Sequence, residues 1–373
     1  MRLVFLFMSY GPASEGSNVG YDPTIKSGNR FVLKGGLPTE GYFYMLKRML
    51  KETIIDDLII FIESNRDPGM AEIDGIKVYV VPEIKYVEDY LKPDDVIFAR
   101  GGFRTWHNFL VRMQVKGHWL LLYAANTGRA RWKFWDIVFD DLCKGHWTDI
   151  RKRFFYQFKK PIDPDLFYMQ NRKRDFDICI GASHIHDKKS QWKAIDAIIE
   201  YQKAYGPIKC IMPGAIKRGV HTNHILPKIK EHGLNVALPG MVSRAEVCNY
   251  MNRSKVFIYL GNSGQNDRGP LEALSCGCPV ILGGTSRHSP IFADMKIGCR
   301  ITDNPNDPVK VSLDIKRSLE IHTEGLRDHT QSYFERTNGM DQVVIPEMKR
   351  LFDVIRKNPV PDTDALKIEY GVK

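Results

Sequence analysis

Short apolar runs and amphipathic stretches alternate along the whole chain. The apolar runs, rich in β-branched and aromatic residues, predict buried strands at residues 2–8, 57–62, 77–81, 95–99, 119–124, 136–140, 177–181, 207–212, 255–260 and 279–282. Apolar residues at helical spacing predict helices at residues 40–52, 191–205, 271–276 and 340–356. This order predicts an α/β fold whose parallel sheets carry helices on both faces. Because 373 residues are too many for one small core, two such domains are expected.

One stretch, residues 255–282, combines a strand, a loop rich in Gly and Asn, a short helix and a second strand. Pro270 falls where the first helical turn would begin, and Gly277 falls where the helix would end. A glycine-rich loop that leads into a helix N-terminus favours binding of a phosphate or diphosphate. Glu272, near the start of the helix, could accept hydrogen bonds from sugar or ribose hydroxyls. The alternative is an ordinary strand–helix turn in which Glu272 is a solvent-facing residue of the first helical turn.

Residues 269–281, G-P-L-E-A-L-S-C-G-C-P-V-I, resemble the E-x7-E segment of GT-B glycosyltransferases of the GT4 group, which usually ends in L-E-A-M-A-C-G-x-P-V-V. Glu272 matches the second glutamate of that motif. The first glutamate falls on Gly264, so its carboxylate is missing, and Asp267 is the nearest acidic residue. The resemblance implies a GT-B fold, in which two Rossmann-like doubly wound domains face each other across a cleft.

A second segment, residues 177–190, resembles the V-G-R-x5-K-G segment of the same group, whose basic pair neutralises the donor diphosphate. Lys189 aligns with the lysine, and Lys188 takes its place after a shift of one residue. The arginine position falls on Ser183, and His184 or Arg268 could replace that cation. His184 could also pair with another histidine, His186, as metal ligands. A third ligand at the usual spacing is missing, so no metal site is expected.

Further matches at residues 160–167 and 235–258 extend the resemblance over the middle of the chain. Within the latter, Ser243 and Glu246 have the spacing of a capping box. The resemblance implies an acceptor-side domain at residues 1–170, a nucleotide-sugar domain at 171–340, and a helix at 341–373 that returns to the first domain. The polar tail after Pro359 is expected to be frayed or to lie on the surface.

In the first domain, the resemblance implies that the double glycine Gly35–Gly36 approaches the donor phosphates. Asn126 takes the place of a histidine that lies beside the donor sugar in related enzymes. An amide can donate a hydrogen bond to a sugar but cannot act as a general base near neutral pH. His107 is a weaker candidate after the preceding strand.

The resemblance therefore implies transfer of a sugar from a UDP- or GDP-linked nucleotide donor to a hydroxyl of a carbohydrate, glycoprotein or glycolipid. Retention of anomeric configuration and independence of metals and other cofactors are expected. The catalytic candidates are Lys189, Glu272 and Asn126. The donor-binding candidates are Gly35, Gly36, Ser183, His184, Lys188, Asn266, Asp267, Arg268, Gly269, Pro270 and Leu271. The residues alone support only a nucleotide or phosphoester binder. The alternatives are an inactive GT-B-like protein that binds a ligand or partner, a nucleotide-sugar epimerase of the same architecture, and a non-enzymatic anion-binding protein.

The chain has an excess of basic residues, and its formal net charge of +10 suits anionic partners. The densest basic run, residues 151–160, is interleaved with aromatic residues. It could form a helix at a membrane surface, but a solvated linker whose aromatics pack on the domain is the preferred interpretation. No motif typical of nucleic-acid binding is present, so no such partner is expected.

Two further features of composition bear on where the protein works. Its seven cysteines are scattered without a C-x-x-C pair, and no apolar run reaches the roughly eighteen residues of a membrane span. Residues 1–8 have the pattern of a strand and lack the basic leader of a signal peptide. A cytoplasmic protein, with peripheral membrane contact as an option, is expected.

Overall fold

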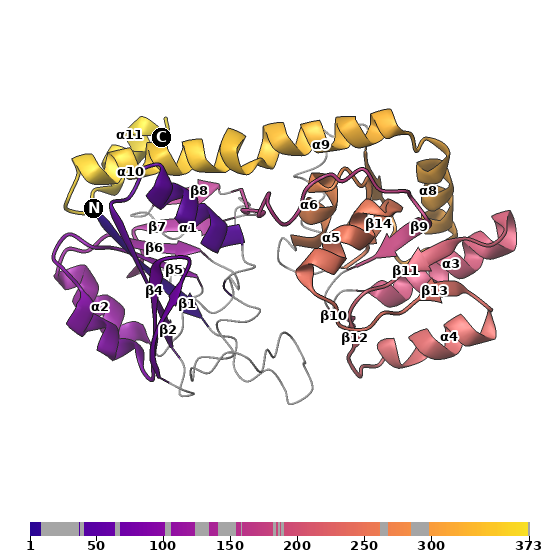
Figure 1. The fold of residues 1–373 in the computed structure, drawn as a ribbon, viewed down its shortest axis with the longest axis horizontal. Coiled ribbons are helices and arrows are strands. Elements are labelled where there is room, and N and C mark those ends of the chain that lie inside the picture. The colour runs from indigo at the N-terminus through magenta and orange to yellow at the C-terminus, as the bar shows by residue number, and fades with distance from the viewer. Residues whose placement is uncertain are drawn as a thin grey trace. The chain divides into compact units, whose positions relative to one another are not determined.

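The structure is a computed structural model that describes residues 1–8, 37, 41–63, 68–100, 106–123, 134–140, 154–157, 159–181, 184–185, 187, 190–261, 268–284 and 298–371. The chain divides into two compact units. The first unit contains the described residues up to Pro161 together with the segment Asp341–Lys373, and the second contains Ile162–Met340. Each unit is built on a parallel sheet with helices, which confirms the predicted α/β class (Figure 1).

The sheet of the first unit has eight strands in the order β3-β4-β2-β1-β5-β6-β7-β8. They are β1 Arg2–Met8, β2 Asp57–Glu63, β3 Gly69–Ile73, β4 Ile76–Val81, β5 Val96–Arg100, β6 Leu120–Tyr123, β7 Ile137–Asp140 and β8 Phe154–Gln157. All neighbours pair in parallel except β3 and β4. The helical elements are α1 Gly41–Lys51, the 3₁₀ helix η2 Ile84–Tyr90, α2 His107–Val115, α10 Ile345–Lys357 and α11 Thr363–Glu369. The π-helical turn η7 Met340–Val344 begins at the boundary of the two units.

Two elements of this unit correct the sequence analysis. The basic run at residues 151–160 is not a helix, because its centre forms the edge strand β8 with Phe154 and Tyr156 buried. The polar tail after Pro359 is not frayed, because α11 forms there and buries Leu366 completely, although the other described residues of the tail are exposed or half-buried, in line with the expected surface position. Tyr370, just after α11, lies with its ring centroid 5.2 Å from that of Phe154. Aromatic packing therefore joins the last helix to the edge of the sheet.

The sheet of the second unit has six parallel strands in the order β13-β11-β9-β14-β15-β16. They are β9 Phe176–Ile180, β11 Lys209–Ile211, β13 Asn235–Ala237, β14 Ser254–Tyr259, β15 Val280–Gly283 and β16 Cys299–Thr302. A separate pair joins β10 His184–Ile185 to β12 Ala215–Ile216. The helices are α3 Gln191–Tyr205, the 3₁₀ turn η6 Thr222–His224, α4 Ile225–Glu231, α5 Arg244–Asn252, α6 Arg268–Ser275, α8 Pro308–Glu320 and α9 Glu324–Asn338. The strand order is that of a doubly wound nucleotide-binding sheet.

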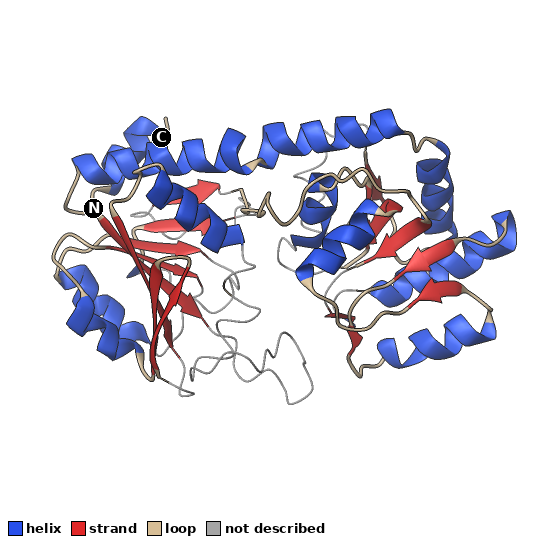
Figure 2. Ribbon diagram, viewed as in Figure 1, coloured by secondary structure: helices blue, strands red, loops and turns tan. Residues whose placement is uncertain are grey.

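Alternation along the strands of this sheet produces two apolar cores, one on each face, and helices cover both faces (Figure 2). In β14, Val256 and Ile258 pack with α3 and α8, whereas Phe257 and Tyr259 pack with residues of α5 and α6. The capping box predicted at the start of α5 is confirmed, with Ser243 accepting from the Glu246 amide. The apolar side of α6 packs in the same core as Phe257 and Tyr259, which fixes this helix against the sheet.

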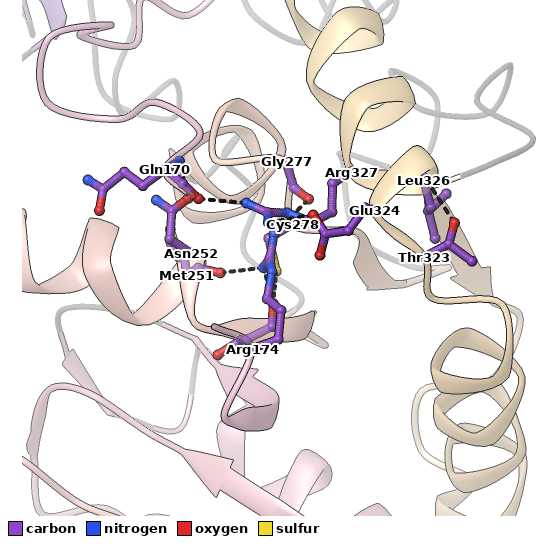
Figure 3. A network of polar contacts seen from close by, with 11 residues as sticks. Gln170, Arg174, Met251, Asn252, Gly277, Cys278, Thr323, Glu324, Leu326 and Arg327 are labelled. Carbon is purple, nitrogen blue, oxygen red and sulfur yellow. Dashed lines mark hydrogen bonds and ion pairs between the residues drawn. The ribbon is translucent and has the colours of Figure 1, made fainter. Parts of the chain in front are cut away.

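Two arginines of the second unit bind backbone carbonyls, Arg174 at the ends of two helices and Arg327 in the irregular segment before β9 (Figure 3). Arg174 donates to Met251 O in the last turn of α5 at 3.1 Å, to Gly277 O just after α6 at 3.3 Å, and also to Ser254 O. Arg327 of α9, only 3% exposed, donates to Gln170 O at 2.9 Å. A helix leaves its last carbonyls unpaired and partly negative, so a cation there satisfies them by both hydrogen bonding and charge.

We expect Arg174→Met to lower the free energy of unfolding by about 2–4 kcal/mol, because the carbonyls that Arg174 serves lose their donor. The neighbouring exposed residue Arg172 provides a matched control, and Arg172→Met should change stability by less than about 0.5 kcal/mol. Urea unfolding of both variants measures the difference. Equal losses in the two variants would contradict the assigned role.

The pKa of His322, between α8 and α9, is lowered to about 4, first by burial and next by the charge of Arg174. The unfolded imidazole has a pKa near 6.5, so the unfolded chain takes up this proton first as the pH falls. We therefore expect stability to decrease between about pH 6.5 and pH 4, and His322→Asn to reduce that decrease. Urea midpoints measured across this range test it, with His224→Asn at an exposed position as the control.

Candidate functional site

The two segments that resemble donor-binding motifs leave the sheet of the second unit from adjacent strands. Ile180, the last residue of β9, pairs with Ile258 in β14, and the Gly181 N–H donates to Ile258 O at 3.1 Å. Between β9 and β14 the strand order reverses direction, which makes this the topological switch point of the sheet. Ligands of doubly wound sheets bind beyond the carboxyl ends of the strands at that point.

The segment between β9 and α3 has a residue with left-handed backbone at each end. Gly181 has φ +58° and Ser190 has φ 55°, both in the left-handed region that favours glycine. The Ser190 side chain does not cap α3, although its N–H is bound to Asp187 O at 3.1 Å. The N-terminus of a helix attracts an anion through its amides and its dipole, so α3 presents a favourable end to this segment.

The helix after β14 is held close to its strand by small and apolar residues. A Cβ on Gly269 would lie 3.2 Å from Cζ of Phe257, tighter than most real contacts, so a side chain there would push α6 off the sheet. Pro270 and Leu271 are buried in the same region, with Leu271 in the core. Gly277, at φ +64°, ends the helix as predicted.

Glu272 does not face solvent, so the alternative interpretation of this residue is wrong. The residue is 1% exposed, and because α6 begins at Arg268 it lies beyond the first helical turn. Arg244 forms an ion pair with Glu272 Oε1, and Arg268 Nε lies 3.8 Å from the same oxygen. Oε2 has no partner among the residues that the structure describes. A buried carboxylate is thus neutralised on one oxygen and left with acceptor capacity on the other.

Arg244 is the residue of this site that sequence reasoning missed. Its guanidinium lies 4.6 Å from the ring centroid of the buried Phe167, which fixes the cation on a second side. The capping box at Ser243 was a signal that Arg244 opens α5. Its partner on α6 is 28 residues away, a pairing that no local pattern reports.

Most other candidates from the sequence lie outside the described residues: Gly35, Gly36, Asn126, Ser183, Lys188, Lys189, Asn266 and Asp267. His184 is placed in β10 opposite Ala215, but its side chain is not described. His107, at the start of α2, packs edge-on against Phe134. The structure therefore brings together Arg244, Arg268 and Glu272, together with the Gly269–Leu271 turn of α6.

The described residues contain no group of three or more His, Cys, Asp or Glu side chains that could hold a metal ion. None of the helices in that part of the chain has the length and apolar character needed to cross a membrane.

No protein-family model matches the chain, and no curated protein matches its sequence. Solved structures do match over almost the full length. Sucrose-phosphate synthase from Thermosynechococcus elongatus is 13% identical with a TM-score of 0.69, covering 95% of this chain and 99% of that one. Anabaena HepE with UDP and glucose is 14% identical with a TM-score of 0.64, covering 95% and 100%. An E. coli trehalose-6-phosphate structure with UDP-2-fluoro glucose is 9% identical with a TM-score of 0.63, covering 94% and 99%.

These structures are GT-B glycosyltransferases. This chain has the GT-B fold. The predicted architecture is therefore confirmed, although identities at this level establish only the fold.

The buried ion pair generates a test by double-mutant cycle. We expect Arg244→Met to cost about 2–4 kcal/mol of unfolding free energy, because Glu272 keeps a buried charge with only Arg268 nearby. Glu272→Gln should be destabilising as well, and the double variant should lose less than the sum by about 1–3 kcal/mol. Urea unfolding of the four proteins measures the coupling. Additivity within about 0.5 kcal/mol would contradict the pair.

Proposed function

We propose that the protein is a glycosyltransferase that moves a sugar from a nucleotide-diphosphate donor to an acceptor hydroxyl. The observation that carries this proposal is the convergence, at the switch point of the second sheet, of the two segments that resemble donor-binding motifs. Two of the named neighbours contain UDP or a UDP-sugar analogue, which supports a UDP-linked donor over a GDP-linked one. The acceptor belongs to the carbohydrates, glycoproteins or glycolipids.

The diphosphate is proposed to lie against the segment that follows β9 and leads to α3, where Gly181 has the left-handed backbone of a tight turn and the Ser190 side chain does not cap the helix. Lys189 is the residue proposed to neutralise the leaving diphosphate, and Lys188 takes this role if the alignment is shifted by one residue. Ser183 and His184 belong to the same segment. As the bond from the sugar to the diphosphate breaks, negative charge grows on the leaving oxygen, and fixed cations and amides stabilise that change. The acceptor oxygen forms the new bond to the sugar, and its proton passes to the leaving diphosphate oxygen. With these cations in place, the proposal requires no metal.

The ribose is proposed to bind at Glu272. Arg244 and Arg268 lie at Oε1, so Oε2 is the oxygen that would accept from a ribose hydroxyl. Asn266, Asp267, Gly269, Pro270 and Leu271 are proposed to contact the donor in the same region. In the first unit, Gly35 and Gly36 approach the donor, and Asn126 hydrogen-bonds the donor sugar. Retention of anomeric configuration belongs to the same proposal.

An inactive relative that binds a nucleotide through the same segments is the second candidate. The absence of two charged groups favours this candidate. The related motifs have a glutamate and an arginine where this chain has Gly264 and Ser183. Turnover separates the two functions. A panel of sugar nucleotides incubated with the protein should show slow hydrolysis of one donor for a transferase and none for a binding protein.

We expect Glu272→Gln to weaken UDP binding by about 1–3 kcal/mol, the range for a lost charged hydrogen bond. Binding of 2′,3′-dideoxy-UDP should hardly change, because that analogue lacks the hydroxyls concerned. Calorimetric titration of both nucleotides into both proteins gives the ratio directly and cancels any effect of lowered stability. If the two affinities fall together, the ribose role of Glu272 is wrong.

A further inference from the structure

An exposed surface of the second unit carries basic and aliphatic side chains together. It is formed by the loop at residues 217–224 and by α4, and we call it the basic surface. Its exposed members are Lys217, Arg218, Val220, His221, His224, Leu226 and Lys230. The segment from residue 217 to 231 contains four Lys or Arg residues and a single acidic one, Glu231. Lys228, the fourth cation, is already paired with Asp196.

Hydrogen bonds fix the loop in one shape. Thr222 is 1% exposed, its N–H donates to Asp187 Oδ1 at 2.9 Å, and its hydroxyl donates to Lys217 O at 2.6 Å. The His221 ring stacks on Trp192 at a centroid distance of 4.2 Å. A Cβ on Gly219 would lie 2.7 Å from Asp187 Oδ2, so the loop packs closely over that carboxylate. A partner that binds here meets a preformed loop and pays little to order it.

Aliphatic side chains project from this polar loop and from the start of α4. Val220 is 74% exposed and Leu226 is 51% exposed, although Thr222 and Ile225 beside them are buried. Single exposed aliphatics are common on soluble proteins and need no explanation. Here both lie among exposed cations within ten residues of sequence, a combination that a purely anionic partner would not use.

We propose that the basic surface binds an anionic membrane surface. Lys217, Arg218 and Lys230 would contact lipid phosphates and carboxylates, while Val220 and Leu226 enter the boundary between headgroups and acyl chains. Basic and aliphatic side chains both strengthen binding to a lipid interface, whereas binding to a nucleic acid is strengthened chiefly by the charge. The basic run at residues 151–160 cannot serve in this way as a helix, because its centre forms β8, in which Phe154 and Tyr156 are buried. This proposal does not depend on glycosyl transfer.

Sedimentation with lipid vesicles tests the proposal on the full chain. The protein should bind vesicles of phosphatidylcholine with phosphatidylserine and should not bind phosphatidylcholine alone. Each Lys or Arg near such a surface strengthens binding about fivefold, so Lys217→Gln with Arg218→Gln should weaken it about 25-fold. Lys349→Gln with Lys357→Gln, at two exposed positions of α10, removes the same charge and should have little effect.

A second variant separates the apolar contribution from the charge. Val220→Ser with Leu226→Ser should weaken vesicle binding about tenfold while leaving its salt dependence unchanged. Thermal unfolding of each variant verifies folding, since none of the four side chains is buried. Equal binding to neutral vesicles, or equal loss in the α10 control, would overturn the proposal. So would binding of an RNA or DNA oligonucleotide that needs Lys217 and Arg218 but tolerates both serines.

Discussion

Buried carbonyl groups at the ends of helices need hydrogen-bond donors, and in the second unit Arg174 meets this need for two helices. Arg174 serves the ends of both α5 and α6, and Arg327 ties α9 to the irregular segment at Gln170. Because one side chain bridges the ends of two helices, α5 and α6 are fixed relative to each other. That relation sets the separation of Arg244 and Glu272, which lie on those two helices. The candidate site therefore depends on cations that take no part in its chemistry.

Part of the second unit could be predicted from the sequence, because local pattern determines its central strands β9, β11, β14 and β15 and the helices α3 and α6. Helices α4, α8 and α9 and strand β16 were not predicted. Helix α3 has the expected bounds, and the Ser243–Glu246 capping box sets the start of α5. In contrast, β3 and β8 were missed. The first is a largely exposed hairpin strand without an apolar run, and the second is surrounded by basic residues that obscure its two buried aromatics. Edge strands gain much of their stability from one neighbour, so their sequences carry a weak signal.

The candidate site likewise has a part that local sequence pattern predicts and a part that it does not. The turn from Gly269 to Glu272 could be located by its motif, since strand, glycine and helix follow one another directly. The burial of Glu272 and its pairing with Arg244 could not be located in this way, because the pair joins side chains from separate helices.

One connection links the site to the basic surface. The Lys217 N–H donates to Ile185 O at 2.9 Å, so the loop and the segment after β9 share a backbone ladder.

Gly277 has a consequence for how such proteins diverge. A Cβ there would lie 2.8 Å from Met169 Sδ and 3.2 Å from Arg327 O, and the backbone already occupies the left-handed region. Its neighbours Cys276 and Cys278 are completely buried. Selection for folding alone would preserve these three residues of the motif in a descendant that had lost its activity. In a lineage of this protein, the informative position is Glu272, because the role proposed for its carboxylate concerns the ligand, whereas the glycine serves the fold.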